Sequence, residues 1–356
     1  MNHKHMSLAV KYRPNNWDSV VEQDSTKVIL QQQLESGEFK NSYLFVGGAG
    51  TGKTTCARIF ADEINNHDGT PIELDAASNS GVEDVRSIIQ QAKTKSLDSE
   101  YKVFIIDECH SLSNTAWQAF LKLIEEPPAK SIFIFCTTNP EKIPKTILSR
   151  VQRYDFKRIS QQGIVDRLKY IIEKENTDMI LEAGNRDVLN YDYDDEAVEY
   201  LAKLADGGMR DAITLMDKCL SYNSDLTIEN VVKSLGVADY DTMRALTLNY
   251  CIEAQDHIIE IIERVHNDGK DLKQFIRQYI NFVLDVKKYF ILGNFECLQI
   301  PQTDDNISFL KSMERNDYWD KISDLLDLLI RINSEIKYDS SPKYMIEAML
   351  LGGINK

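Results

Sequence analysis

The feature that most constrains this chain is a glycine-rich string, GGAGTGKT, at residues 47–54. It fits the pattern G-x-x-x-x-G-K-[ST] and stands between an apolar run and a segment with helical periodicity. Glycines let the backbone curl so that its N–H groups point to one place, and a helix N-terminus adds a positive dipole end. The string therefore predicts a phosphate-binding loop between a strand and a helix. The alternative, a glycine-rich turn with a chance lysine, fits this context poorly.

Five short segments are typical of strands. They lie at residues 43–46, 71–74, 103–106, 132–135 and 153–156. Those at 43–46, 103–106 and 132–135 are continuous apolar runs, as in strands buried on both faces of a parallel sheet, and the other two are weaker. A helical pattern with an apolar face separates two of the runs: Trp117, Phe120, Leu121 and Ile124. The prolines at 127–128 must end that helix. This alternation predicts a doubly wound α/β domain to about residue 158.

From residue 160 onward the pattern is helical to the end, with a polar, acidic interruption at residues 185–196 and glycine breaks at 207–208 and 236. We therefore expect three domains: residues 1–158, a helical domain at 159–236 and a second helical domain at 237–356.

Composition narrows the function classes. The net charge is −15, and it lies in the second half: residues 1–160 carry 19 Lys/Arg against 20 Asp/Glu, whereas residues 161–356 carry 22 against 36. Strong nonspecific DNA binding by the chain alone is not expected. The sequence has no apolar run of membrane-spanning length and no Cys-x-x-Cys pair. We expect no membrane partner and a cytoplasmic location.

Charged and hydroxyl side chains stand where nucleotide chemistry needs them. Lys53 would reach the β- and γ-phosphates, and the Thr54 hydroxyl would bind Mg²⁺. Asp107 and Glu108 end the apolar run at 103–106, where the first would join the Mg²⁺ shell and the second would act on the attacking water. A solvated acidic turn is the minor alternative. His110 completes a helicase-like DECH string, but a histidine there is more often a surface or packing residue.

Residues 136–139 (CTTN) follow another buried strand, and they would either sense the γ-phosphate or cap the next segment. Arg150 and Arg210 each follow a turn. From these residues alone, a catalytic arginine and a surface ion pair stay open alternatives for both.

In this order, the motifs resemble the AAA+ clamp-loader ATPases, most closely the gamma/tau subunits of bacterial DNA polymerase III and more distantly the small subunits of replication factor C. The resemblance covers roughly residues 7–236. The strings that carry it are KYRP at 11–14, WDSVVEQ at 17–23, ELDAASNSGVEDVR at 73–86, LKLIEEPP at 121–128, TTNPEKIP at 137–144, TILSR at 146–150 and GMRDA at 208–212.

The resemblance implies an α/β AAA+ P-loop domain with a parallel five-stranded sheet and flanking helices, followed by a helical lid and a helical collar. It also implies ATP and Mg²⁺ as cofactors. The residues that it places around the nucleotide are Gly47, Gly48, Ala49, Gly50, Thr51, Gly52, Lys53, Thr54, Thr55, Tyr12, Arg13, Val20, Val21 and Arg210.

Catalytic roles follow by the same resemblance. Thr54 and Asp107 would hold Mg²⁺, Glu108 would be the catalytic base, and Thr138 takes the sensor 1 place with Asn139 beside it.

The resemblance also implies roles for two arginines, for DNA contacts and for partner proteins. Arg210 takes the sensor 2 place and would read the chain's own nucleotide, whereas Arg150 would be a finger reaching ATP held by a neighbouring subunit. Asn79 and Ser80, expected at the start of a helix, would touch the DNA backbone. The implied partners are other clamp-loader subunits, a sliding clamp and primer–template DNA.

Three departures from the bacterial pattern bear on these expectations. Residues 65–70 are too few, and lack the cysteines, for the family's zinc module, so no zinc is expected. The usual Ser-Arg-Cys string reads SRV at 149–151, which keeps the arginine. The sequence ends at Lys356 without the long tail of tau, which favours a short, gamma-like subunit.

The leading hypothesis is therefore the ATPase motor subunit of a sliding-clamp loader. A DExH-type helicase is an alternative that would require a second RecA-like lobe. Two further alternatives are a scaffold subunit that does not hydrolyse ATP and an AAA+ ATPase that remodels DNA for another task.

Overall fold

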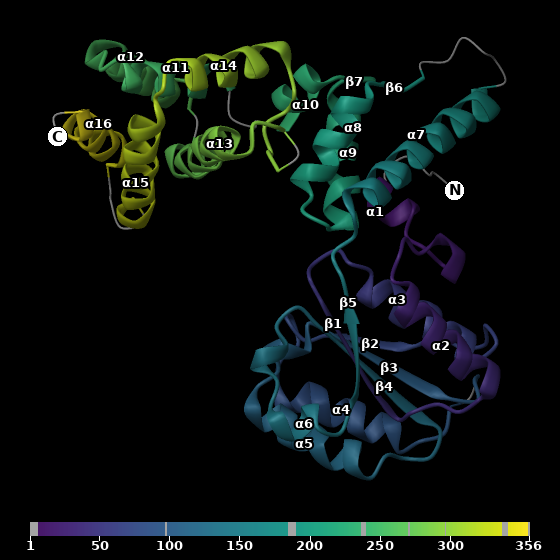
Figure 1. Cartoon of the computed structure of the whole chain (residues 1–356). Helices are drawn as coiled ribbons and strands as arrows, with labels where there is room; N and C mark the ends of the chain where they lie inside the picture. The colour runs from purple at the N-terminus through teal and green to yellow at the C-terminus, as the bar shows by residue number, and fades with distance from the viewer. Residues whose placement is uncertain are drawn as a thin grey trace. The chain divides into compact units, whose positions relative to one another are not determined.

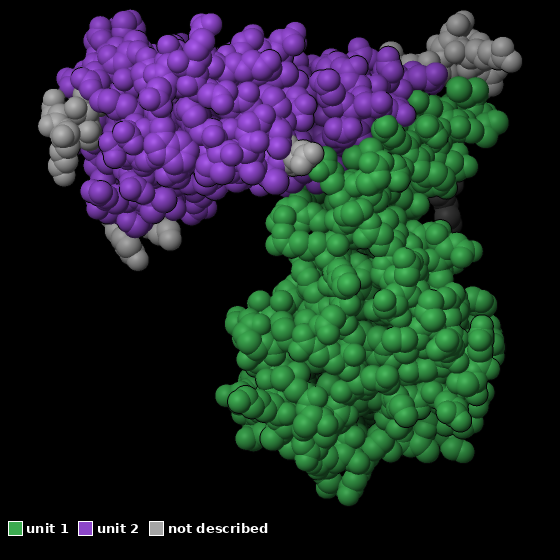
Figure 2. All heavy atoms as spheres, in the orientation of Figure 1, with its two compact units in different colours: residues 1–186, 205–217 green, residues 187–204, 218–356 purple. Residues whose placement is uncertain are grey.

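The computed structural model describes residues 6–96, 98–183, 190–235, 240–269, 271–295, 297–336 and 341–354. The chain divides into two compact units, residues 1–186 with 205–217 and residues 187–204 with 218–356, coloured green and purple in Figure 2.

The first unit is built on a five-stranded sheet in which every neighbouring pair is parallel, in the order β2-β3-β4-β1-β5 (Figure 1). The strands are β1 Ser42–Gly47, β2 Ile72–Asp75, β3 Lys102–Asp107, β4 Ser131–Thr137 and β5 Gln152–Phe156. The five strands expected from the sequence are confirmed. Because the strands are parallel, the carboxyl ends of β1, β3 and β4 meet at one edge of the sheet.

Two hydrophobic cores cover the two faces of this sheet. Tyr43 and Phe45 of β1 pack in one core with Phe60, while Leu44 between them packs in the other core with Trp117. All five side chains are nearly or fully buried. Burial on both faces explains why the central strands read as continuous apolar runs.

The helices of this unit lie before, between and after the strands. They are α1 Leu8–Lys11, α2 Asp24–Ser36, α3 Lys53–Ile64, α4 Val82–Ala92, α5 Asn114–Glu125, α6 Lys145–Leu148 and α7 Gln161–Ala183. Three short 3₁₀ turns, η1 Trp17–Ser19, η2 Cys109–Ser111 and η3 Pro140–Lys142, complete it. The expected helix over 117–124 is confirmed as α5, which the Ser113 hydroxyl caps by accepting from Ala116 N. It ends before the prolines at 127–128, as expected.

The second unit is almost entirely helical. Its helices are α8 Asp195–Leu204, α10 Ile228–Leu235, α11 Tyr240–Cys251, α12 Gln255–Asn267, α13 Leu272–Leu292, α14 Asp304–Arg315, α15 Trp319–Glu335 and α16 Pro342–Ile354. Helix α9, Met209–Tyr222, begins in the first unit and ends in the second. The core of residues 240–354 contains Tyr279 and Phe282 of α13 with Leu325 and Leu329 of α15.

The expectation of helices alone after residue 160 was wrong in one detail. Asp192–Tyr193 (β6) and Asp225–Leu226 (β7) form a small parallel sheet. Strands of two residues are too short to show a period, so only the tertiary pairing defines them.

The predicted domain boundaries can be compared with the two compact units only in part. Residues 205–217, which include the glycine break at 207–208, group with the first unit. The predicted break at Gly236 and residues 184–189 of the acidic stretch lie outside the described residues. Within the described part of the chain, no helix is both long enough and apolar enough to cross a bilayer.

Candidate functional site

One pocket of the first unit gathers most of the predicted site residues. Its lining comes from the N-terminal segment, the glycine-rich loop, the end of β3, and helices α7 and α9. Predicted residues in this lining are Tyr12, Arg13, Val20, Val21, Ala49, Gly50, Thr51, Gly52, Lys53, Thr54, Thr55, Asp107, Glu108 and Arg210.

The glycine-rich loop follows β1 directly and leads into α3, which begins at Lys53. Gly50 and Gly52 have φ angles of 69° and 99°, a region that side chains with a Cβ rarely adopt. A Cβ on Gly50 would also lie 3.0 Å from the Cα of Gly208. The loop thus presents the N-terminus of α3 to the pocket, as the sequence predicted, and lies directly against the residues that precede α9.

Lys53 is a buried cation at the start of α3, only 6% exposed. Its Nζ donates to the carbonyl oxygens of Gly47 and Gly48 at 2.9 and 2.7 Å. These two residues are absent from the pocket lining, but they hold the ammonium beside it. Burial lowers the pKa of Lys53, and the nearby negative charges of Glu108 and Asp107 oppose that shift.

Oxygen ligands suited to Mg²⁺ lie next to one another where β3 meets α3. The Thr54 hydroxyl donates to Asp107 Oδ2 at 2.8 Å, and Asp107 Oδ1 accepts from the Glu108 backbone N–H at 3.0 Å. A hydroxyl and a carboxylate that already meet at the pocket wall form a hard, all-oxygen donor set. The chemistry of these residues therefore fits Mg²⁺.

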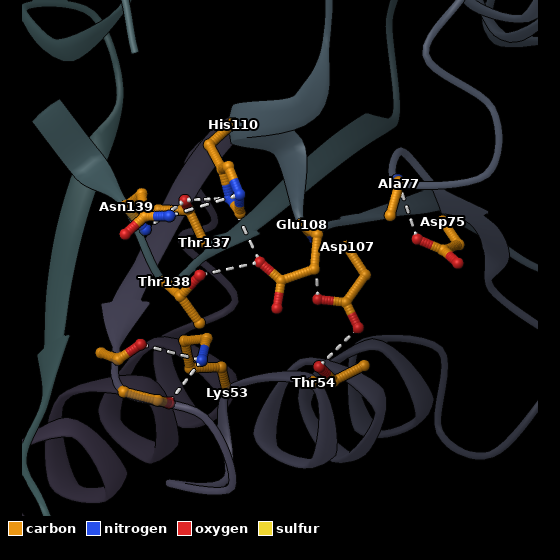
Figure 3. A network of polar contacts seen from close by, with 12 residues as sticks. Lys53, Thr54, Asp75, Ala77, Asp107, Glu108, His110, Thr137, Thr138 and Asn139 are labelled. Carbon is orange, nitrogen blue, oxygen red and sulfur yellow. Dashed lines mark hydrogen bonds and ion pairs between the residues drawn. The ribbon is translucent and has the colours of Figure 1, made fainter. Parts of the chain in front are cut away.

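The Glu108 side chain points toward Thr138, the residue that follows β4 (Figure 3). Its backbone has φ 46°, the left-handed region, and a 3₁₀ turn at residues 109–111 follows it. One carboxylate oxygen, Oε2, accepts from the Thr138 hydroxyl at 3.1 Å and lies 3.2 Å from His110 Nδ1. Thr138 and Glu108 meet because β3 and β4 are neighbours in the sheet.

The two threonines of residues 136–139 make different contacts, and the γ-phosphate-sensing role stays a prediction. Thr137 caps the turn, since its Oγ1 accepts from the Asn139 backbone N–H at 3.0 Å. Thr138 instead reaches the Glu108 carboxylate. The Thr137 hydroxyl also lies 3.2 Å from His110 Nδ1, so both hydroxyls contribute to the surroundings of Glu108.

The N-terminal segment and α9 bring further arginines to the pocket. Burial lowers the pKa of Arg13, and the positive charges of Arg58 and Arg210 lower it further. Arg167 of α7, which the sequence interpretation missed, donates from Nη2 to the Tyr12 carbonyl at 3.0 Å and lines the same pocket. Arginine side chains that repel one another in a pocket are stabilised by a bound anion, so this cluster favours an anionic ligand.

Gln23 is a second residue that sequence interpretation passed over. It is 8% exposed, and its Nε2 donates to the carbonyls of Lys157 and Thr51 at 2.7 and 3.4 Å while its Oε1 accepts from Lys157 N at 3.1 Å. It thereby ties the N-terminal segment to the loop and to the residues after β5. Its signal in the sequence was its place at the end of the WDSVVEQ string.

The start of α9 is fixed to the glycine-rich loop. The backbone N–H of Met209 donates to the Gly50 carbonyl at 3.0 Å, and Gly208 N donates to Ala205 O at 2.9 Å. This places Arg210, the second residue of α9, in the pocket wall.

Arg150, Asn79 and Ser80 are absent from the pocket lining, as are Gly47, Gly48 and Thr138. Arg150 follows α6 and is exposed, pairing with Glu125 Oε1 at 2.9 Å and donating to the Thr146 carbonyl at 2.8 Å. Asn79 and Ser80 do not begin a helix, which corrects the expectation, because α4 starts at Val82 after Gly81.

A local turn explains the late start of α4. Asp75 Oδ1 accepts from Ala77 N at 2.9 Å and Oδ2 accepts from the Ser78 hydroxyl at 3.0 Å, while Asn79 N donates to Asp75 O at 2.9 Å. These bonds satisfy the backbone in a turn, so the helix begins only after them.

Comparison with known proteins finds relatives that match both the pocket residues and the helical segment that follows them. A family model described as DNA polymerase III, delta subunit, matches residues 63–160, and one described as DNA polymerase III clamp loader subunit, ATPase lid domain, matches residues 187–225. DNA polymerase III subunit tau of Bacillus subtilis (strain 168) is 32% identical over 96% of this chain. DNA polymerase III subunit gamma of Buchnera aphidicola is 26% identical over 98% of both chains. The chain is thus similar to DNA polymerase III tau and gamma subunits along almost its whole length.

The chain covers unequal shares of these relatives. The chain spans 62% of the Bacillus subtilis relative and 35% of DNA polymerase III subunit tau/gamma of Haemophilus influenzae, which is 34% identical over 65% of this chain. Among solved structures, a Thermotoga maritima RuvB Holliday junction branch migration motor matches 73% of this chain and 86% of its own, with 19% identity and a TM-score of 0.49. A likeness of that size carries no argument about function.

Zinc is usually held by clusters of His, Cys, Asp and Glu side chains. Among the described residues, no group of three or more of these side chains could hold a metal ion. The expected lack of zinc in this chain stays a prediction.

Proposed function

We propose that the chain is the ATPase motor subunit of a DNA sliding-clamp loader, which opens the clamp and places it on primer–template DNA. One observation supports the ATPase activity in particular. A single pocket is lined by Lys53, Thr54, Asp107, Glu108 and Arg210. The similarity to these relatives supports the clamp as the object of this activity, since the lid model names a clamp loader subunit.

The pocket residues suit phosphoryl transfer from ATP. When bound, Mg²⁺ neutralises charge on the phosphate oxygens, and Thr54 and Asp107 would hold it. Lys53 and Arg210 offset the charge of the β- and γ-phosphates. Glu108 orients a water molecule and accepts its proton as the water oxygen bonds to the γ-phosphorus and the bond to the ADP oxygen breaks.

Arg150 is proposed to complete the site of a neighbouring subunit. Its side chain is 40% exposed, pairs with the exposed Glu125 and lies outside the chain's own pocket lining. An exposed ion pair of this kind contributes little to stability, so exchanging Glu125 for a neighbour's phosphate costs little. A finger supplied by another subunit makes oligomerisation a requirement of hydrolysis.

The remaining parts of the proposal rest on the resemblance. Asn79 and Ser80 contact the DNA backbone, other clamp-loader subunits form the assembly, and the chain works in the cytoplasm without zinc. Residues 1–158, 159–236 and 237–356 act as nucleotide domain, lid and collar. The helicase alternative calls for a second RecA-like lobe, whereas the described residues contain, besides the five-stranded sheet, one sheet of two short strands.

The deciding experiment is steady-state ATP hydrolysis by the complex rebuilt with its own partners, with and without clamp and primed DNA. We expect strong stimulation by clamp and primed DNA together. Arg150→Ala should abolish that stimulation while ATP binding persists, and Lys53→Ala should abolish nucleotide binding.

Arg153→Ala is the matched control, because Arg153 is equally exposed and forms an ion pair with Asp155 on β5. It should behave as wild type. Turnover indifferent to clamp and primer would leave an AAA+ ATPase with a different substrate to remodel. Unchanged nucleotide binding by Lys53→Ala would remove the basis of the proposal.

A further inference from the structure

The Glu108 carboxylate is held on one side only. Both of its side-chain contacts involve Oε2, which accepts from Thr138 Oγ1 at 3.1 Å and lies 3.2 Å from His110 Nδ1. None of the described residues donates a hydrogen bond to Oε1. Because Glu108 lines the pocket, this arrangement leaves one oxygen available to a water molecule and fixes the other against the sheet.

His110 is placed for this contact by the turn that follows β3. Glu108 has φ 46°, and Ser111 N donates to Glu108 O at 2.9 Å to close the 3₁₀ turn. Cys109 is fully buried and anchors that turn in the core. The imidazole therefore folds back over the tip of β4, with its side chain 14% exposed (Figure 3). A left-handed conformation at a non-glycine residue is uncommon and persists where its surroundings hold it.

The partners of the imidazole select one tautomer. Nδ1 lies 3.2 Å from both the Thr137 hydroxyl, which can donate or accept, and Glu108 Oε2, which as a carboxylate oxygen only accepts, so a proton on Nδ1 suits both neighbours. Nε2 is then an acceptor, and it lies 3.5 Å from Nδ2 of Asn139, an amide that donates. A proton on Nδ1 and a bare Nε2 suit Glu108 and Asn139 respectively; this assignment follows from the partners.

We propose that His110 is a positioning residue for hydrolysis, which orients the Glu108 carboxylate so that Oε1 faces the attacking water. The proposal rests on the proposed ATPase function and deepens it. His110 links the end of β3 to the end of β4, because Asn139 and Thr137 contact the same ring. A shift of the β4 tip would then be transmitted to the carboxylate of the base.

The test compares His110→Ala, His110→Asn and a matched control, His257→Ala. His257 is an exposed histidine of α12 in the other unit. The asparagine amide nitrogen occupies nearly the place of Nδ1 and keeps the donor to Glu108, whereas alanine removes it. Steady-state hydrolysis gives kcat and KM, and single-turnover hydrolysis isolates the chemical step. Fluorescent ATP titration gives binding, and retention of ADP with aluminium fluoride reports the transition-state geometry.

We expect His110→Ala to lower kcat about tenfold, the loss for one hydrogen bond to a charged group, with KM and ATP affinity within about twofold of wild type. Affinity for ADP–aluminium fluoride should fall by about the same factor, because only the transition state needs an oriented water. His110→Asn should recover kcat to within about threefold. His257→Ala should match wild type, and thermal melting should show all three variants folded.

Three results would overturn the proposal. The first is a wild-type kcat in His110→Ala. The second is a raised KM with unchanged kcat, which would indicate nucleotide binding instead. The third is a folded His110→Asn no more active than His110→Ala, which would make the ring a packing element. A wild-type chain that fails to hydrolyse ATP in its assembled complex would overturn the proposed function itself, and a normal wild type beside unaffected His110 variants would overturn this inference alone.

Discussion

Buried charges occur in both units, but their surroundings differ. In the helical unit, Asp285 is 1% exposed; Oδ2 accepts from Gln299 N and Ile300 N at 2.6 and 2.9 Å, and Oδ1 accepts from Lys288 Nζ at 2.9 Å. In the nucleotide unit, Lys53 is held by two loop carbonyls but lines a pocket. The first charge is enclosed by donors of its own chain, whereas the second faces space that a ligand can enter.

This difference separates a structural charge from a functional one. Asp285 joins α13 to the segment at 298–300, which has no regular secondary structure, and so satisfies backbone N–H groups that would otherwise be buried without partners. Glu108 and Lys53 leave part of their bonding capacity toward the pocket. Substitutions in the two units should therefore affect different measurements.

The largest expected effect is on turnover. Glu108→Gln should lower kcat about 1,000-fold, because an amide cannot accept the proton of the attacking water. ATP affinity and the melting temperature should stay near wild type, as the side chain keeps its shape. The exposed Glu38→Gln should leave hydrolysis unchanged. A comparable loss in both variants would break the distinction between pocket and surface carboxylates.

The next effect is on stability. Asp285→Ala should lower the free energy of unfolding by about 3 kcal/mol, because it leaves two backbone donors without their acceptor and removes the ion pair with Lys288. Chemical denaturation measures this change, and ATP affinity of the chain should not move. Asp327→Ala, on the exposed face of α15, should stay within about 0.5 kcal/mol. Intact stability in Asp285→Ala would show that a buried charge enclosed by its own chain is dispensable.

The smallest effect sharpens the comparison inside the nucleotide unit. Gln23 is buried and polar but bonded to backbone groups, as Asp285 is. Gln23→Ala should lower the free energy of unfolding by about 1–2 kcal/mol and raise KM for ATP only slightly, since the glutamine supports the loop without facing phosphate. Gln32→Ala, on the exposed side of α2, is the matched control. A loss of kcat in Gln23→Ala, at unchanged stability, would show that Gln23 has a catalytic role and not a structural one.

Much of the nucleotide unit could be predicted because its signals are local. Each strand is a run of four to seven neighbouring residues, and the glycine-rich string encodes its own curl through positions that adopt positive φ. Asp107 and Glu108 were found for the same reason, as they directly follow an apolar run. The core of the helical unit was predicted only as helices, since helical periodicity shows an apolar face but not its partner.

Tertiary structure decided the contacts between residues far apart in the chain. Only the β3–β4 pairing brings Thr138 and His110 to the same carboxylate oxygen, and only the folded loop gives Gln23 its partners near residue 157. The β6–β7 pairing arose in the same way. Local sequence determines which backbone conformation each segment adopts, but hydrogen bonds between distant segments depend on sheet order and packing, which no single stretch of sequence contains.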